Sequence, residues 1–120
     1  MKRLTPLVLL LITVLSYSFK PTQNDLRYFV QFKINSIETF EQADEINKKM
    51  LLHSGIEASR ADHITSTYFC YLKSGSNYDQ KDFENWFKKL DLNISCFNKG
   101  VDTKNEVIAP YILKDCKNEK

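Results

Sequence analysis

The hydrophobic pattern of residues 30–46, VQFKINSIETFEQADEI, changes its period halfway along. Apolar and polar residues alternate over 30–34, as in a β-strand with one buried face, whereas Phe40, Ala43 and Ile46 recur at helical spacing. A strand that leads directly into an amphipathic helix restricts the fold, because both apolar faces have to pack on a shared core. The junction KINSIETF contains no glycine, cysteine or histidine.

Two helices are predicted from their capping residues and apolar stripes. Ser36, followed by Thr39, is the expected cap of the first helix, and Gly55 is its expected stop. Asp79 is the expected cap of the second helix. Lysines near the C-terminal end of each helix suit the helix dipole. Trp86 and its apolar neighbours at helical spacing are expected to be core residues rather than a ligand site.

Four strands are predicted over residues 26–34, 56–61, 65–72 and 92–97. The order strand-helix-strand-strand-helix-strand predicts an α+β, ferredoxin-like domain over residues 26–100, with a four-stranded antiparallel sheet and two helices on one face. The other face would carry polar and aromatic side chains, namely Phe29, Gln31, Lys33, Phe69 and Tyr71. These side chains either bind a partner or lie under the C-terminal tail, residues 101–120. Coverage by the tail is the favoured interpretation. Pro110 leaves the tail segment EVIAPYIL as either an edge strand or a packed tail.

The N-terminus has the pattern of a cleaved secretory signal peptide over residues 1–18. Lys2 and Arg3 precede the apolar run LVLLLITVL, which is too short for a stable membrane span, and SYS supplies small residues for cleavage. An uncleaved anchor is the alternative. Residues 19–25 are expected to be a loose lead-in, and the mature chain is expected in the periplasm or outside the cell.

The charge balance excludes an electrostatic case for nucleic-acid binding. The chain has 17 basic and 15 acidic residues, and removal of Lys2 and Arg3 with the signal peptide leaves 15 of each. A mature chain that is close to neutral has no basic surplus for phosphates. Its 42% hydrophobic and 27% charged residues are typical of a globular protein, and 120 residues suffice for one domain.

Three cysteines lie in the exported part of the chain, so one disulfide and one free thiol are expected in an oxidising compartment. With the first strand between the third and fourth, Cys70 and Cys96 would both face the helices about 10 Å apart, beyond the roughly 7 Å between α-carbons that a disulfide allows. The favoured pair is therefore Cys96 and Cys116, which would fasten the tail. Three unpaired thiols are the alternative.

Residues 28–97 resemble the heavy-metal-associated (HMA-like) domain family of small copper chaperones and pump domains. The resemblance rests on element order and on the segments FKINSIETF, GIEASRADHIT and DFENWFKKLDLNISCF. It implies a ferredoxin-like fold, and in that family a CxxC pair in the first loop binds the metal. The matching segment here, INSIET, has neither cysteine, and Asn35, Ser36 and Glu38 offer hard oxygen ligands instead of soft thiolates.

The two histidines are expected at opposite ends of the domain. His63 falls in the turn between the second and third strands, at the same end as the junction, so it forms a candidate ligand loop with Asn35, Ser36 and Glu38. A solvated turn histidine is the favoured alternative. His53 falls at the end of the first helix, where it complements the helix C-terminus.

Three functions remain open from the sequence. The favoured one is an exported, non-enzymatic HMA-like module that binds a protein or small ligand without a cofactor. The alternative is an atypical copper or zinc protein that uses Cys70 or Cys96 with residues of the tail. A small enzyme is the third, and no acid–base or nucleophile constellation of catalytic residues supports it.

Overall fold

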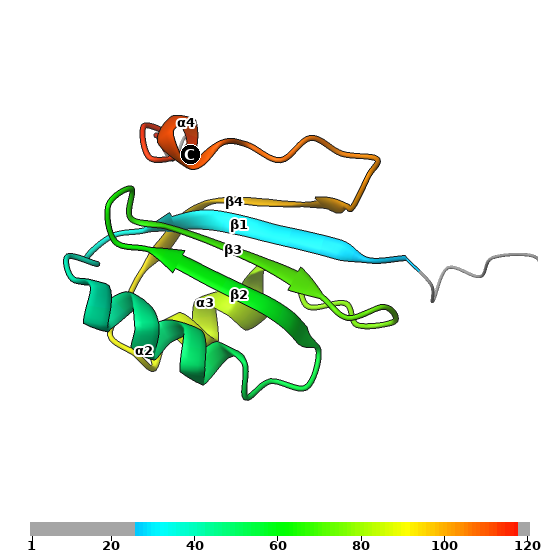
Figure 1. Cartoon of the computed structure of the whole chain (residues 1–120), viewed down its shortest axis with the longest axis horizontal. Helices are drawn as coiled ribbons and strands as arrows, with labels where there is room; N and C mark the ends of the chain where they lie inside the picture. The colour runs from blue at the N-terminus through cyan, green and yellow to red at the C-terminus, as the bar shows by residue number, and fades with distance from the viewer. Residues whose placement is uncertain (1–25, 118–120) are drawn as a thin grey trace, which may run out of the picture.

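A four-stranded antiparallel sheet is the middle layer of residues 26–117, the part of the chain that the computed structural model describes (Figure 1). The strand order is β2-β3-β1-β4, so β1 lies between β3 and β4. The predicted α+β class and antiparallel sheet are therefore confirmed. The strands are β1 (Tyr28–Ile34), β2 (Ile56–Asp62), β3 (Thr67–Leu72) and β4 (Ile94–Val101).

Two different layers cover the faces of the sheet (Figure 1). Helices α2 (Phe40–Met50) and α3 (Gln80–Lys88) lie on one face. The tail, residues 102–117, crosses the other face and contains the short helix α4 (Pro110–Leu113). The expected signal peptide and lead-in lie outside the described residues. Within 26–117, none of the helices combines the length and the apolar character needed to cross a membrane.

Helix α2 begins later than the sequence predicts, because Thr39 and not Ser36 is its cap. The Thr39 hydroxyl accepts a hydrogen bond from the Gln42 backbone N–H, and the Gln42 side-chain oxygen accepts one from the Thr39 N–H, at 3.2 and 3.0 Å. The prediction fails because Ile37 is buried in the core, and the chain reaches its extended cap residue, Thr39, only after Ile37. The predicted cap Asp79 of α3 is confirmed.

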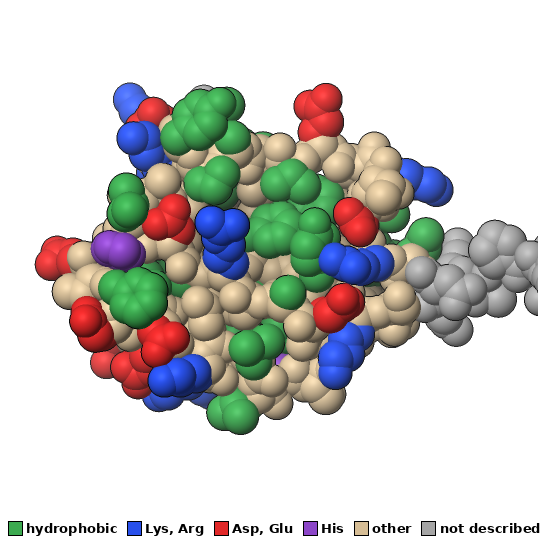
Figure 2. All heavy atoms as spheres, in the orientation of Figure 1, with side chains coloured by type: hydrophobic (Ala, Val, Ile, Leu, Met, Phe, Trp, Pro, Cys, Tyr) green, Lys and Arg blue, Asp and Glu red, His purple; other side chains and the backbone are tan. Residues whose placement is uncertain are grey.

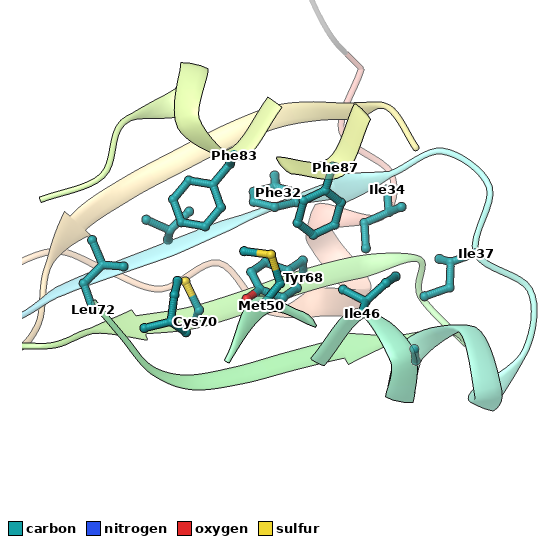
Figure 3. Close-up of a cluster of buried hydrophobic side chains, with 13 residues drawn as sticks. Phe32, Ile34, Ile37, Ile46, Met50, Tyr68, Cys70, Leu72, Phe83 and Phe87 are labelled. Carbon is teal, nitrogen blue, oxygen red and sulfur yellow. The ribbon is translucent and has the colours of Figure 1, made fainter. Parts of the chain in front are cut away.

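The core lies between the sheet and helices α2 and α3, and Phe32 of β1 stands at its centre (Figure 3). Its ring centroid is 5.0 Å from those of Tyr68 and Phe87 and 5.7 Å from that of Phe83. These rings pack in stacked and edge-to-face geometries that favour aromatic pairs. Met50 and Ile46 complete this layer from α2.

A chain of polar side chains joins α2 to the edge strand β2. The hydroxyls of Tyr68 and Ser59 are 2.7 Å apart, and Ser59 donates to the Asn47 side-chain oxygen. The same Asn47 oxygen accepts the backbone N–H of Ala61 at 2.8 Å. Burial raises the pKa of the Tyr68 hydroxyl well above its usual value, so this hydroxyl stays neutral. The network therefore fixes the helix beside β2 and satisfies a backbone donor of that strand.

Strand β4 contains a bulge that changes which side chains face the core. Gln31 pairs with Asn98 and Lys33 with Ser95, so Cys96 and Phe97 together lie opposite Phe32. Cys96 adopts a left-handed backbone conformation, with φ of 55°. Because the extra residue shifts the alternation, Phe97 packs on the Phe32 ring instead of Cys96. The prediction that Cys96 faces the helices is therefore wrong.

The remaining thiol, Cys70, is buried in the core on the helix side of β3. It lies opposite Val30 in the β1–β3 register. Burial raises the pKa of this thiol to about 12. Because only a thiolate is an effective nucleophile, the folded protein should keep Cys70 unreactive.

We expect alkylation to distinguish the three cysteines. Without reductant, iodoacetamide should leave the native chain unlabelled and should add one label, on Cys70, after unfolding in guanidinium chloride. Reduction before unfolding and labelling should give three labels. Mass spectrometry reads the number and position of the labels. Three labels without reductant would contradict the disulfide, and rapid labelling of the native chain would contradict a buried Cys70.

Candidate functional site: the groove between the tail and the sheet

The Gln31 side chain joins β1 to the tail although it is only 2% exposed. Its amide nitrogen donates to the Ile108 carbonyl, and its amide oxygen accepts the Ile108 backbone N–H, each at 2.8 Å. The same oxygen accepts a hydrogen bond from the Asn98 side chain at 2.7 Å. A buried amide is costly without partners, so these bonds make the sheet face depend on the tail.

Apolar burial and further hydrogen bonds hold the tail elsewhere. Leu113 of α4 is 2% exposed, and Phe29 of β1 is 1% exposed. Lys33 donates to the Cys116 carbonyl at 2.9 Å. Of the two interpretations of this face, coverage by the tail is therefore confirmed for Phe29 and Gln31, while Phe69 and Tyr71 keep partial exposure.

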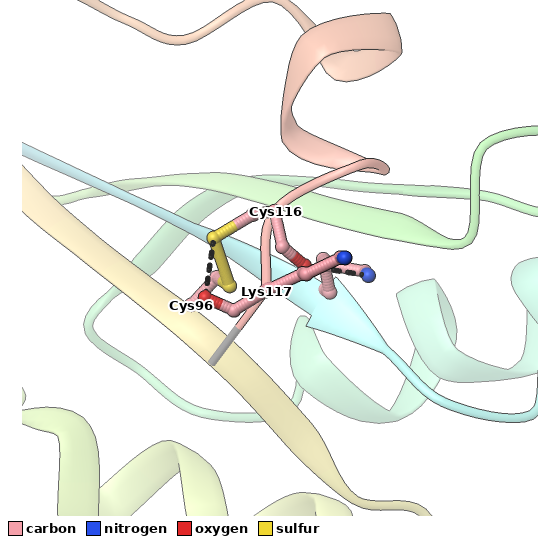
Figure 4. Close-up of a disulfide and its surroundings, with 4 residues drawn as sticks. Cys96, Cys116 and Lys117 are labelled. Atoms are coloured by element: carbon pink, nitrogen blue, oxygen red, sulfur yellow. Dashed lines mark hydrogen bonds between the residues drawn. A yellow bond between two sulfur atoms is a disulfide. The ribbon is translucent and has the colours of Figure 1, made fainter. Parts of the chain in front are cut away.

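A disulfide joins the end of the described tail to the bulge in β4 (Figure 4). It links Cys96 to Cys116, the pair that the expected strand order favours, with their α-carbons 6.4 Å apart. The bond closes a loop between two cysteines that are 20 positions apart in the sequence. Restricting the unfolded chain by a loop of this size contributes about 3 kcal/mol of stability. The left-handed backbone at Cys96 accompanies the bulge from which this bond reaches the tail.

A groove of about 350 Å³ lies between the tail and the β3 side of the sheet. Its apolar walls come from Phe69 of the sheet and from Val107, Ile108, Pro110 and Leu113 of the tail. Figure 2 shows hydrophobic side chains gathered between the tail and the sheet, with Lys or Arg side chains among them. The polar lining residues are Gln31, Arg60, Asp62 and Thr67. The tail therefore forms one wall of an apolar groove.

The predicted ligand loop is assembled only in part. Asn35, Ser36 and Glu38 are exposed, and the Glu38 backbone N–H donates to the Gln42 side chain, which belongs to the α2 cap. The Ser66 hydroxyl, from the turn that carries His63, donates to the Ile37 carbonyl at 3.1 Å. The junction and the turn thus lie at the same end of the sheet. The His63 ring meets the Phe40 ring edge-on, with centroids 6.2 Å apart.

A second hollow of about 310 Å³ lies between α2 and α3 and reaches the junction at Ser36. Its charged lining residues have both signs. Lys49 pairs with Glu45 within α2 at 3.5 Å, and Lys89 and Asp91 come from the end of α3 and the loop after it. This hollow thus offers neither a predominantly apolar wall nor a charge of one sign.

His53 follows α2, but its ring lies on Trp86 of α3 with centroids 3.9 Å apart. Partial burial, with a smaller contribution from the Lys89 charge, lowers the pKa of His53 below its usual 6.5. The imidazole is therefore mainly neutral at pH 7. Because a mainly neutral, stacked ring adds little positive charge, His53 contributes more to packing on Trp86 than to the helix end.

The described residues contain no arranged set of metal ligands. Over residues 26–117, no group of three or more His, Cys, Asp or Glu side chains is arranged to hold an ion. Cys96 and Cys116 are bonded to each other, and Cys70 lies in the core.

Comparisons with known proteins identify no family for this chain. No family model matches the sequence, and no match is found among the curated proteins or the solved structures.

Sequence reasoning missed the groove because its two walls are far apart in the chain. Gln31 and Ile108 are separated by 77 residues. The available signal was Gln31 itself, a polar residue within the apolar strand segment YFVQFKI. A buried amide in that setting requires partners, and only a covering segment could supply a free backbone N–H and carbonyl.

Replacement of Gln31 by leucine should destabilise the protein by about 1–3 kcal/mol, because the Ile108 backbone groups and Asn98 would lose their partner. Urea unfolding without reductant measures the change. Gln80→Leu is the matched control: within residues 26–117 this exposed side chain of α3 bonds only Glu84, so we expect less than about 0.5 kcal/mol. Equal losses in the two variants would contradict the role assigned to Gln31.

Proposed function

We propose that this chain is an exported, non-enzymatic binding module of the HMA-like type, and that it binds a small ligand in the groove between the tail and the sheet. It lacks the cysteine pair that binds metal in that family. The tail supplies a different site, on the face of the sheet that α2 and α3 do not cover (Figure 1). The observation that carries the proposal is the apolar groove of about 350 Å³.

The arrangement of the elements supports the HMA-like, ferredoxin-like part of the proposal. The helices α2 and α3 alternate with the strands in the order that this fold requires, and β1 lies between β3 and β4. Fold similarity alone carries no function, so the ligand has to be inferred from the groove.

The dimensions of the groove support a small ligand rather than a protein partner. Ligand pockets span about 300–1,000 Å³, and they combine mostly apolar walls with a few polar groups. The groove lies at the lower end of this range, with Phe69 and the tail as walls. A protein interface would instead require about 800 Å² of surface from each partner.

The disulfide supports export, because such bonds persist in oxidising compartments and are rare in the cytosol. It also opposes the alternative of copper or zinc binding through cysteines outside the usual loop. That alternative needs free thiolates, whereas Cys96 and Cys116 are paired and the Cys70 thiol has a pKa of about 12. We therefore favour ligand binding over metal handling.

Filling the groove should abolish binding. We expect 1-octanol, a small apolar probe, to shift the backbone amide NMR signals of Phe69 and Ile108, and Val107→Trp to remove these shifts. Val107 is 47% exposed, so the larger side chain can enter the groove with little strain on the core.

Ile112→Trp is the matched control for this experiment. Ile112 is 56% exposed and lines a hollow on the other side of the tail, beside Cys96 and Asn98. The control should keep the octanol-dependent shifts. Loss of binding in both variants, or in neither, would contradict the groove as the site.

A further inference from the structure

The polar groups that line the groove differ in whether they already have partners. Gln31 is bonded to Ile108 and Asn98. The Thr67 hydroxyl is 2.7 Å from that of Thr65. These side chains therefore have no strong unused capacity to bind a ligand.

The carboxylate of Asp62 is also engaged, although it lies in the same groove. One of its oxygens accepts the Ile64 backbone N–H at 2.9 Å, and the other accepts the Thr65 hydroxyl at 3.0 Å. Both bonds belong to the turn between β2 and β3. Asp62 therefore stabilises the turn, and it forms no ion pair with Arg60.

Among the charged residues that line the groove, Asp62 has hydrogen-bond partners within the described chain and Arg60 has none. Within residues 26–117, the Arg60 guanidinium has neither a hydrogen bond nor an ion pair. It stands opposite Phe69 in the β2–β3 register, and Phe69 stands opposite Gln31 in the β1–β3 register. The cation is thus on the tail side of the sheet, next to the apolar wall, and is exposed to solvent.

We propose that the ligand is a small amphipathic carboxylate, with its apolar body between Phe69 and the tail and its carboxylate on Arg60. This inference rests on the proposed function and adds the ligand's chemical class. A guanidinium with unused N–H donors beside an apolar wall complements a molecule that carries one negative group on a hydrocarbon body, whereas the Asp62 oxygens are already occupied by the turn. The planar guanidinium presents two parallel N–H donors that match the two oxygens of a carboxylate.

Octanoate and 1-octanol test the charge separately from the apolar body, because both carry an eight-carbon chain. Titration followed by amide NMR should show that octanoate binds about three- to tenfold tighter than octanol, a modest factor because Arg60 is exposed. Arg60→Gln should abolish this preference by weakening octanoate binding more than octanol binding. The preference should also fall with added salt.

Lys104→Gln is the matched control, since Lys104 is an exposed cation in the turn after β4 and does not line the groove. It should keep the preference for octanoate, and Arg60→Lys should keep only part of it because an ammonium cannot form the two parallel bonds. Equal binding of octanol and octanoate to the unaltered chain would overturn this inference and leave the groove intact. Failure of both probes to bind would overturn the proposed function as well.

Discussion

The two-way hydrogen bonding between the Gln31 side chain and the Ile108 backbone determines how the tail meets the sheet. The one side-chain amide supplies the hydrogen-bond donor and acceptor that a neighbouring strand would otherwise provide. The irregular tail segment can therefore form backbone hydrogen bonds on a buried surface. Phe29 is buried on the same face, and Leu113 of the tail is buried with it. Without the tail, the buried amide and this apolar surface would be exposed together.

The bulge in β4 explains how a disulfide can reach the tail from a strand whose side chains also fill the core. Phe97 packs on Phe32 on one side of the sheet, and Cys96 bonds Cys116 on the other. One inserted residue makes both contacts compatible, at the expense of a left-handed conformation at Cys96. Such a conformation costs on the order of 1 kcal/mol, less than the stabilisation expected from the crosslink.

The sequence predicts those parts of the fold that have local signals. Alternation and helical spacing give the six main elements, and Asp79 caps α3 as expected. The cap of α2 is missed because Ser36 and Thr39 are both good capping residues, and only the burial of Ile37 decides between them. The bulge at Cys96 has no glycine or proline to reveal it, so its shift of the alternation could not be read from the residues. The groove depends on contacts across 77 residues, which local patterns do not encode, so Arg60 was not identified.

Hydrogen exchange at the Ile108 amide tests the central claim most directly, because within residues 26–117 this N–H donates to the Gln31 side chain and to no backbone carbonyl. NMR of the oxidised chain should show this amide strongly protected from exchange with deuterated solvent. Reduction of the disulfide between Cys96 and Cys116 should speed its exchange, while the Phe32 amide in the central strand β1 stays protected. Exchange of Ile108 at the rate of an unstructured peptide in the oxidised chain would contradict the account.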